Sequence, residues 1–353
     1  MDPRKMSIQR EHVHSLGMLF FLCLLCFLPA YVLSEGEEGV VNGHVSGHFH
    51  RPIKPSNNPT LEKMLARYGE KPTTFATKTK LLQEGDAYDL FEVRFPSPYR
   101  SRHSENNVVW CEYYRSKKEG LLPAVIVLHV LDGKFIAARI ICDYLARIGC
   151  HSLMLKMPYY GERRPKEADI KGVITSDPDI TMRALYQTVL DVRRSASFLA
   201  AQKEVDKEKI GLCGISLGAF ATGLVAGIDG TFPKSAMILG GGDFAGMVMH
   251  GPKEIQEIAE QMKKAGYTYE SLKKKFVFIS PMTYAHRIPP GSLLMINGTQ
   301  DSVVPPDNAK AFWQATKGQP AIIWSECSHY TAVLHIIDFM ETVGAFFVEK
   351  PWT

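Results

Sequence analysis

One serine in the chain has the neighbours that a nucleophile needs. The sequence GISLG at residues 214–218 is the only G-x-S-x-G pattern in the chain. It follows an apolar run typical of a strand and precedes small and apolar residues typical of a helix. Two glycines permit the sharp turn that exposes a serine hydroxyl at a helix N-terminus, where the helix dipole favours negative charge. We therefore predict that Ser216 is a nucleophile; the alternative is a strand-turn-helix unit that merely contains a serine.

An aspartate and a histidine further along the chain could activate this serine. A serine hydroxyl needs a base to take its proton, and the base needs an acid to orient it. Asp301 follows a strand predicted at 293–296, and His329 follows one predicted at 321–324. Both would therefore lie at the same rim of the sheet, and Ser, Asp, His is a known chain order for such a triad. We predict His329 as the base and Asp301 as the acid.

Two other carboxylates compete for the role of the acid. Asp307 follows two prolines and precedes residues that favour a helix, so we predict that it is a helix N-cap. Glu326 is so close to His329 along one loop that we expect it at the surface.

The oxyanion that forms when a serine attacks a carbonyl group needs hydrogen-bond donors, usually two backbone N–H groups. One should belong to Leu217, directly after the predicted nucleophile. The other should come from the loop 129–133, which follows the first strand predicted to be buried, and we assign Leu131. The glycine-rich form of this loop is absent, and we interpret Asp132 as a turn residue.

A loop rich in tyrosine and arginine, PYYGERRP at residues 158–165, also follows a predicted strand. Tyr159, Tyr160, Arg163 and Arg164 could line a substrate pocket, with an arginine binding an anionic group. The alternative, which the sequence leaves equally open, is a loop ordered by an Arg–Glu pair.

The elements that must position these residues alternate between strand and helix, which predicts an α/β fold with a mostly parallel, doubly wound sheet. Strands are predicted at 88–95, 108–114, 124–129, 151–157, 209–214, 235–239, 293–296 and 321–324. The first two should be antiparallel strands at the sheet edge. Helices are predicted at 60–68, 134–148, 179–201, 217–226 and 331–348.

An insertion at about 243–290 interrupts this alternation and contains a predicted helix at 253–275. In doubly wound folds, ligands bind outside the carboxyl ends of the strands, and an excess of chain often lies there. We therefore expect a helical lid over the site, with its lysines forming a solvated face.

The N-terminus resembles a secretory signal peptide, with basic residues before an apolar run at 16–33 and small residues near its end. We predict a signal at 1–34 with cleavage before Glu35; the alternative is an uncleaved membrane anchor at 16–33. Residues 35–58 then form a flexible linker, and 59–353 form the globular domain. The linker histidines lack partner ligands, so we expect them to be solvated and predict no metal site; they are His44, His48 and His50.

Composition excludes other classes of protein. The net charge of +4 is too small to predict nucleic-acid binding. Removal of the signal leaves five cysteines, an odd number without paired spacing, so we predict buried free thiols rather than a disulfide framework.

Residues 89–348 resemble the α/β-hydrolase superfamily, most of all its dienelactone hydrolase-like and acetyl-xylan-esterase-like branch. The resemblance lies in DVRR at 191–194 and the strand that leads to Ser216, in PYYGERRP, and in SPMTY at 280–284. It implies an ester hydrolase with no cofactor. Dienelactone hydrolases use a cysteine nucleophile, so the serine here argues for ordinary esters.

We therefore expect a secreted carboxylesterase that acts on small-molecule or carbohydrate acyl esters. A peptidase or an acyltransferase would use the same triad. A non-catalytic binding protein with this fold is a third alternative, against which the presence of Ser216, Asp301 and His329 argues.

Overall fold

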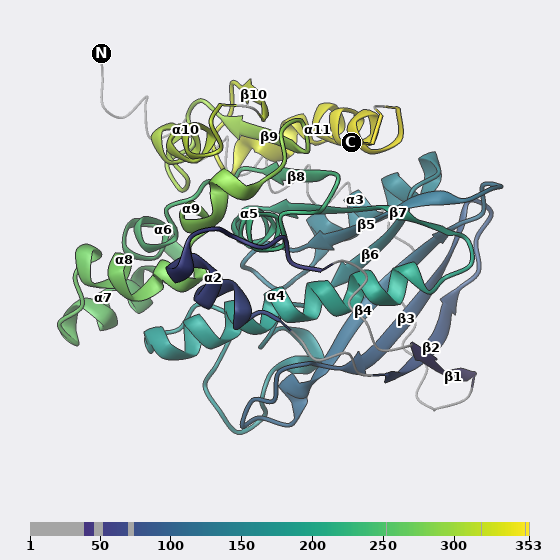
Figure 1. Ribbon diagram of the computed structural model, residues 1–353, viewed down its shortest axis with the longest axis horizontal. Helices are drawn as coiled ribbons and strands as arrows, with labels where there is room; N and C mark the ends of the chain where they lie inside the picture. Colours follow the sequence, from purple (N-terminus) through teal and green to yellow (C-terminus); the bar gives the residue numbers. More distant parts are fainter. Residues whose placement is uncertain are drawn as a thin grey trace, which may run out of the picture.

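The computed structural model of the chain describes residues 39–45, 52–69, 74–251, 253–318, 320–349 and 351–352. The predicted signal or anchor therefore lies outside the described residues, as do His48 and His50. Within the described residues the core is one ten-stranded sheet with helices on both faces (Figure 1). The predicted α/β class and doubly wound sheet are confirmed.

The strands follow the spatial order β1-β2-β3-β4-β6-β5-β7-β8-β9-β10. Their bounds are β1 (Val40–Val45), β2 (Phe75–Gln83), β3 (Tyr88–Pro96), β4 (Val108–Ser116), β5 (Leu122–Leu128), β6 (His151–Leu155), β7 (Val205–Ile215), β8 (Ser235–Ile238), β9 (Leu293–Gly298) and β10 (Ala321–Ser325). All pairs from β6 to β10 are parallel, whereas β1 to β4 and the β4–β6 pair are antiparallel. β5 is buried from Ala124 to Leu128, as its run of β-branched residues predicts.

Helix α4 crosses the front of the sheet in Figure 1 and packs against α5, while α3 lies behind the sheet and packs against α11. The α-helices are α2 (Pro59–Ala66), α3 (Ile136–Ile148), α4 (Pro178–Ala200), α5 (Leu217–Asp229), α6 (Phe244–His250), α7 (Gln256–Lys264), α8 (Tyr269–Lys275), α9 (Pro281–Tyr284), α10 (Pro306–Ala315) and α11 (Ile336–Gly344). The 3-10 helices are η1 (Glu105–Asn107), η2 (Gly161–Arg163), η3 (Lys253–Ile255), η4 (Phe276–Ile279), η5 (Ala285–Arg287) and η6 (Thr331–His335), and a π-helix, η7 (Ala345–Glu349), follows α11.

Part of the predicted linker is a strand. Residues Val40–Val45 pair with β2 in antiparallel register, with Val45 opposite Phe75. The prediction of a flexible linker over 35–58 is therefore wrong at this place. Three valines among six residues favour a strand, but β1 needs β2 as its partner, and β2 was not predicted either.

Two predicted helices are divided. The one at 253–275 consists of η3, α7 and α8, because Gly266 takes a φ of +86° between them and Thr268 begins α8 with a capping box. The one at 331–348 consists of η6, α11 and η7. By length and apolar composition alone, the stretch Thr331–Glu349 could cross a membrane, a test that core helices also pass. Here α11 packs against α3.

The cysteines of the described residues are free and buried, as predicted. They are Cys111, Cys142, Cys150, Cys213 and Cys327.

Candidate active site

Ser216 lies in the turn between β7 and α5, with a φ of +52° that residues other than glycine rarely adopt. The two glycines beside it are required by close contacts. A Cβ on Gly214 would lie 2.1 Å from the carbonyl oxygen of Gly218, and a Cβ on Gly218 would lie 2.2 Å from that of Leu128. The N–H of Ser216 donates to the carbonyl oxygen of Ile238 at 2.9 Å. The turn is therefore held on both sides by backbone.

The structure joins Ser216, His329 and Asp301 in one line of hydrogen bonds. His329 Nε2 lies 2.9 Å from Ser216 Oγ, and His329 Nδ1 lies 2.8 Å from Asp301 Oδ2. The carboxylate can only accept, so Nδ1 carries the proton and Nε2 is left to accept the serine proton. The other oxygen of Asp301 accepts the N–H groups of Val303 at 2.8 Å and Val304 at 2.9 Å. The backbone of its own loop therefore holds the carboxylate in place, in addition to the hydrogen bond with the imidazole.

The loops after β9 and β10 are tied to each other, which sets the spacing of Asp301 and His329. Thr299 N–H donates to Ser325 O at 2.8 Å, and Gln300 N–H donates to Cys327 O at 3.0 Å. Because the two strands are adjacent and parallel, their carboxyl ends present both side chains at the same rim.

The competing carboxylates lie elsewhere. Asp307 is in the first turn of α10 and is exposed, but the N-cap is Pro305, so the prediction that Asp307 caps the helix is wrong. Pro306, at the first helical position, has no N–H that needs a cap. Glu326 is exposed, as predicted.

The predicted oxyanion donors flank the serine. Leu217 is the first residue of α5, where N–H groups have no partner within the helix. Leu131 lines the same cavity as Ser216. Among the hydrogen bonds of the described residues, none uses the N–H of either leucine as donor. Both N–H groups therefore remain candidates for binding a substrate carbonyl oxygen.

A buried histidine, not singled out in the sequence analysis, shapes the loop that carries Leu131. His129 Nε2 accepts the N–H of Met157 at 3.0 Å, so Nδ1 holds the proton and donates to Val130 O at 2.7 Å. Burial lowers the pKa of His129 to about 4, which keeps the ring neutral. The sequence signal was a histidine at the end of the first buried strand.

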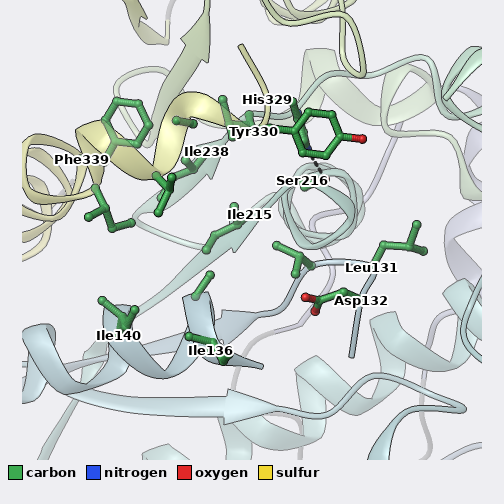
Figure 2. Close-up of a pocket in the computed structure, with 16 residues that line it drawn as sticks. Leu131, Asp132, Ile136, Ile140, Ile215, Ser216, Ile238, His329, Tyr330 and Phe339 are labelled. Atoms are coloured by element: carbon green, nitrogen blue, oxygen red, sulfur yellow. Dashed lines mark hydrogen bonds between the residues drawn. The ribbon is translucent and has the colours of Figure 1, made fainter. Parts of the chain in front are cut away.

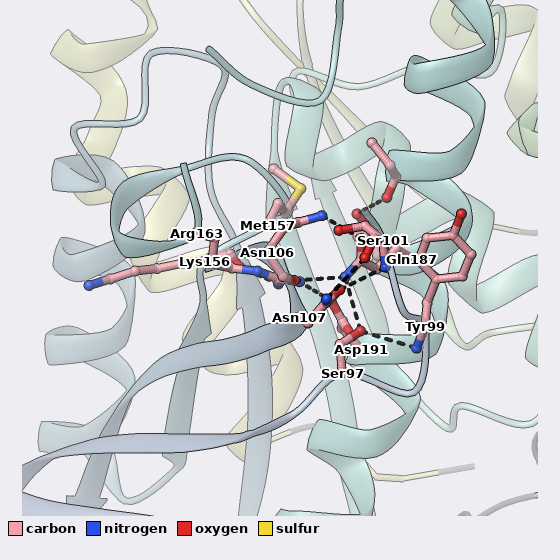
Figure 3. A network of polar contacts seen from close by, with 12 residues as sticks. Ser97, Tyr99, Ser101, Asn106, Asn107, Lys156, Met157, Arg163, Gln187 and Asp191 are labelled. Atoms are coloured by element: carbon pink, nitrogen blue, oxygen red, sulfur yellow. Dashed lines mark hydrogen bonds and ion pairs between the residues drawn. The ribbon is translucent and has the colours of Figure 1, made fainter. Parts of the chain in front are cut away.

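Arg163 was predicted to line a substrate pocket, and this prediction is wrong. Its side chain is fully buried, and its guanidinium pairs with Asp191 of α4 at 2.7 Å. It also donates to the carbonyl oxygens of Lys156 and Asn106, each at 2.9 Å, so it crosslinks α4 to two loops (Figure 3).

The other three residues predicted for a substrate pocket are also absent from the lining of the cavity beside Ser216. Tyr160 is buried, with its ring edge-on to His129, and Tyr159 is buried near His103. Arg164 is exposed and donates to Lys171 O at 3.0 Å. The loop is therefore an ordered structural segment, held by Arg163–Asp191 and by a Lys156–Glu162 pair rather than an Arg–Glu pair.

A cavity of about 290 Å³ opens beside Ser216 (Figure 2). Its walls come from the loop after β5, α3, the end of β7, β8, η6 and α11. The insertion at 243–290 contributes no residue to this lining, so the expected lid does not cover this cavity. The insertion packs instead against α4 and α5, where Lys275 pairs with Asp179 at 2.8 Å and Arg287 donates to Gly227 O at 2.9 Å. In Figure 1, α7 and α8 lie at the left edge, away from α11.

Within the described residues, no group of three or more His, Cys, Asp or Glu side chains is placed to hold a metal ion.

Comparison with family models matches residues 180–337 to the prolyl oligopeptidase family. The matched stretch is less than half of the chain and contains Ser216, Asp301 and His329. No curated protein sequence matches the chain.

Solved structures are similar over most of the chain. An acetyl xylan esterase from Paenibacillus sp. R4 is 19% identical, with a TM-score of 0.63, over 83% of this chain and 97% of that one. Acetyl xylan esterase 1 from Thermoanaerobacterium sp. JW/SL YS485 is 18% identical, with a TM-score of 0.60, over 85% of this chain and 96% of that one. An acylaminoacyl peptidase from Pyrococcus horikoshii is 14% identical, with a TM-score of 0.54, over 80% of this chain but 53% of that one.

At these identities the structural likeness establishes the fold, and the esterases share it over nearly their whole length. The family match falls on the half of the chain that carries the serine turn and the two loops joined to it. The α/β-hydrolase fold that the sequence predicts is therefore confirmed, and the stretch that matches the prolyl oligopeptidase family contains its serine turn.

Proposed function

We propose that this chain hydrolyses carboxylic esters, with Ser216 as nucleophile, His329 as general base and Asp301 as the acid that orients it. The observation that carries the proposal is the line of hydrogen bonds from Ser216 Oγ through both ring nitrogens of His329 to Asp301. This arrangement activates a serine whatever fold holds it.

In the proposed cycle, Ser216 Oγ attacks the ester carbonyl carbon while His329 Nε2 takes the hydroxyl proton. The N–H groups of Leu131 and Leu217 stabilise the resulting oxyanion, and Asp301 stabilises the imidazolium. Collapse breaks the bond to the alcohol oxygen, which receives the proton from His329. Water then attacks the acyl-enzyme with His329 as base, and the carboxylic acid leaves with Ser216 restored.

The similarity to proteins named acetyl xylan esterases supports a small-molecule or carbohydrate ester as substrate. Arg163 is buried in its ion pair with Asp191, and Arg164 does not line the cavity, so neither arginine supports an anionic group on the substrate.

Peptide hydrolysis is the second candidate, because the family match is to the prolyl oligopeptidase family. The same residues would serve, with His329 protonating an amine instead of an alcohol. We favour the ester because the esterases share almost their whole chain with this protein, whereas the acylaminoacyl peptidase shares about half of its own.

The test is turnover of matched p-nitrophenyl esters and p-nitroanilides of the same acyl group, together with labelling by a fluorophosphonate. We expect ester turnover and labelling in the wild type and neither in Ser216→Ala. Faster anilide turnover would favour the peptidase. Labelling that persists in Ser216→Ala would place the nucleophile elsewhere.

We also propose that the protein is exported, with residues 1–34 as a cleaved signal, on the sequence pattern alone. Expression of the full chain in a secreting host followed by N-terminal sequencing tests this. A first residue at or near Glu35 supports it, and an intact Met1 in the membrane fraction supports an anchor at 16–33.

A further inference from the structure

The cavity beside Ser216 is divided into a polar and an apolar end. In Figure 2 the side chains of His329 and Tyr330 lie above Ser216, and Asp132 lies below it at the right of the view, beside Leu131. Away from them the cavity runs between α3 and α11, where Ile140 and Phe339 face it from opposite sides.

The walls of the apolar end are aliphatic or aromatic. They include Ile136, Ala137 and Ile140 from α3, and Val333, Ile336 and Phe339 from the C-terminal helical stretch. A hydroxyl or charged group placed there would lose its hydrogen bonds to water without gaining others from these side chains. An alkyl chain would gain from the same surroundings.

The cavity is much larger than an acetyl group needs. Its volume is about 290 Å³, whereas one water needs only about 10–15 Å³ of such space. A methyl group would fill a small part of it and leave most of the wall without contacts. A chain of several methylene groups would contact side chains of both α3 and α11.

The proposed cycle indicates which part of the substrate occupies this space. The alcohol must leave before water reaches the acyl-enzyme, and His329 exchanges a proton with both. Departure and entry therefore pass the polar end of the cavity. The acyl group stays bonded to Ser216 Oγ throughout, so the apolar space between α3 and α11 suits its alkyl chain.

Resting on the proposed ester hydrolysis, we propose that this cavity is an acyl-chain site that selects aliphatic acyl groups longer than acetyl. Each methylene buried against these walls raises kcat/KM about fourfold. The preference for hexanoyl over acetyl should then be on the order of 100-fold.

Two isomeric esters separate the acyl side from the alcohol side. Ethyl hexanoate and hexyl acetate have the same composition, but only the first has its long chain on the acyl group. We expect kcat/KM to be at least tenfold higher for ethyl hexanoate. A preference for hexyl acetate would overturn the proposal, as would equal turnover of p-nitrophenyl acetate and hexanoate.

Two substitutions at Ile140 place the preference in this cavity. Ile140→Phe, which fills the space, should lower the hexanoate-to-acetate ratio of kcat/KM at least tenfold, and Ile140→Ala should shift the preferred chain to greater length. Ile323→Phe on β10, whose side chain is exposed and outside the cavity, should leave the ratio unchanged.

An unaltered ratio in both Ile140 variants would overturn the acyl-chain site while ester hydrolysis by Ser216 stands. Failure of the wild type to turn over any ester would instead refute the proposed function, and the acyl-chain site with it.

Discussion

A Cβ atom on Gly218 would lie 2.2 Å from the carbonyl oxygen of Leu128, a distance that no side chain tolerates. Helix α5 therefore packs against the end of β5 with no room for a methyl group. The same approach brings Leu217 beside the loop that follows β5, so the contact that demands glycine also sets the distance between the two proposed oxyanion donors.

We expect Gly218→Ala to lower the free energy of unfolding by roughly 3 kcal/mol or more, because backbone must shift to admit the methyl group. Gly120→Ala is the matched control. Gly120 has a positive φ but no atom within 4 Å of a Cβ, so its cost should be that of conformation alone, about 1–2 kcal/mol. Urea unfolding measures both; equal losses would mean that the contact with Leu128 is unimportant.

The assignment of Asp301 predicts a graded loss of turnover. Asp301→Asn should lower kcat on the order of 10⁴-fold, because the amide no longer holds the imidazole in the correct tautomer, against about 10⁶-fold for Ser216→Ala. Asp307→Asn is the control, since Asp307 is exposed on α10 and should keep near-normal turnover. Near-normal turnover of Asp301→Asn, with loss in a Glu326 or Asp307 variant, would refute the assignment.

The local part of the site could be predicted from the sequence. The serine turn depends on five consecutive residues, and the acid and base each follow a strand whose apolar run is visible. The same holds for β5, because a strand buried on both faces needs no partner to be recognised.

The cap of α10 and the division of the predicted helix at Gly266 are local errors, whereas the other failures depend on contacts between distant residues. Arg163 looks like a surface arginine until Asp191, 28 residues away, is brought to it by α4. The strand at 40–45 exists because β2 pairs with it. The walls of the cavity come in part from α3 and α11, which lie about 200 residues apart in the sequence. The apolar faces of these helices predict that they are buried, but they do not predict that a cavity lies between them.

The buried Arg163–Asp191 pair predicts that removal of Arg163 strongly destabilises the protein, whereas removal of the exposed Arg164 does not. Arg163→Ala should lower the free energy of unfolding by about 3–5 kcal/mol, because it removes the ion-pair partner of the buried carboxylate of Asp191 and leaves it only the hydrogen bond from the Ser97 hydroxyl. Arg164→Ala, on the exposed side of the same loop, should change it by less than about 0.5 kcal/mol. A loss of kcat/KM in Arg164→Ala without loss of stability would restore the loop to the substrate site.

His129 predicts how stability depends on pH. Its pKa is about 4 in the folded chain, because of burial, and about 6.5 in an unfolded one. Between these values the unfolded state binds a proton that the folded state does not, so the free energy of unfolding falls as the pH falls from about 6.5 to 4. The loss from this group totals about 3 kcal/mol, and the full contribution is present above pH 6.5.

Urea unfolding of wild type and His129→Gln at intervals between pH 4 and 8 would measure this. Burial also lowers the pKa of His151, so the wild-type slope contains a contribution from that histidine as well. In the variant the slope should be shallower by up to about 1.4 kcal/mol per pH unit, the value for one proton. Parallel curves for the two proteins would show that His129 is protonated in the folded state, and that the hydrogen bond from Met157 to its Nε2 is absent.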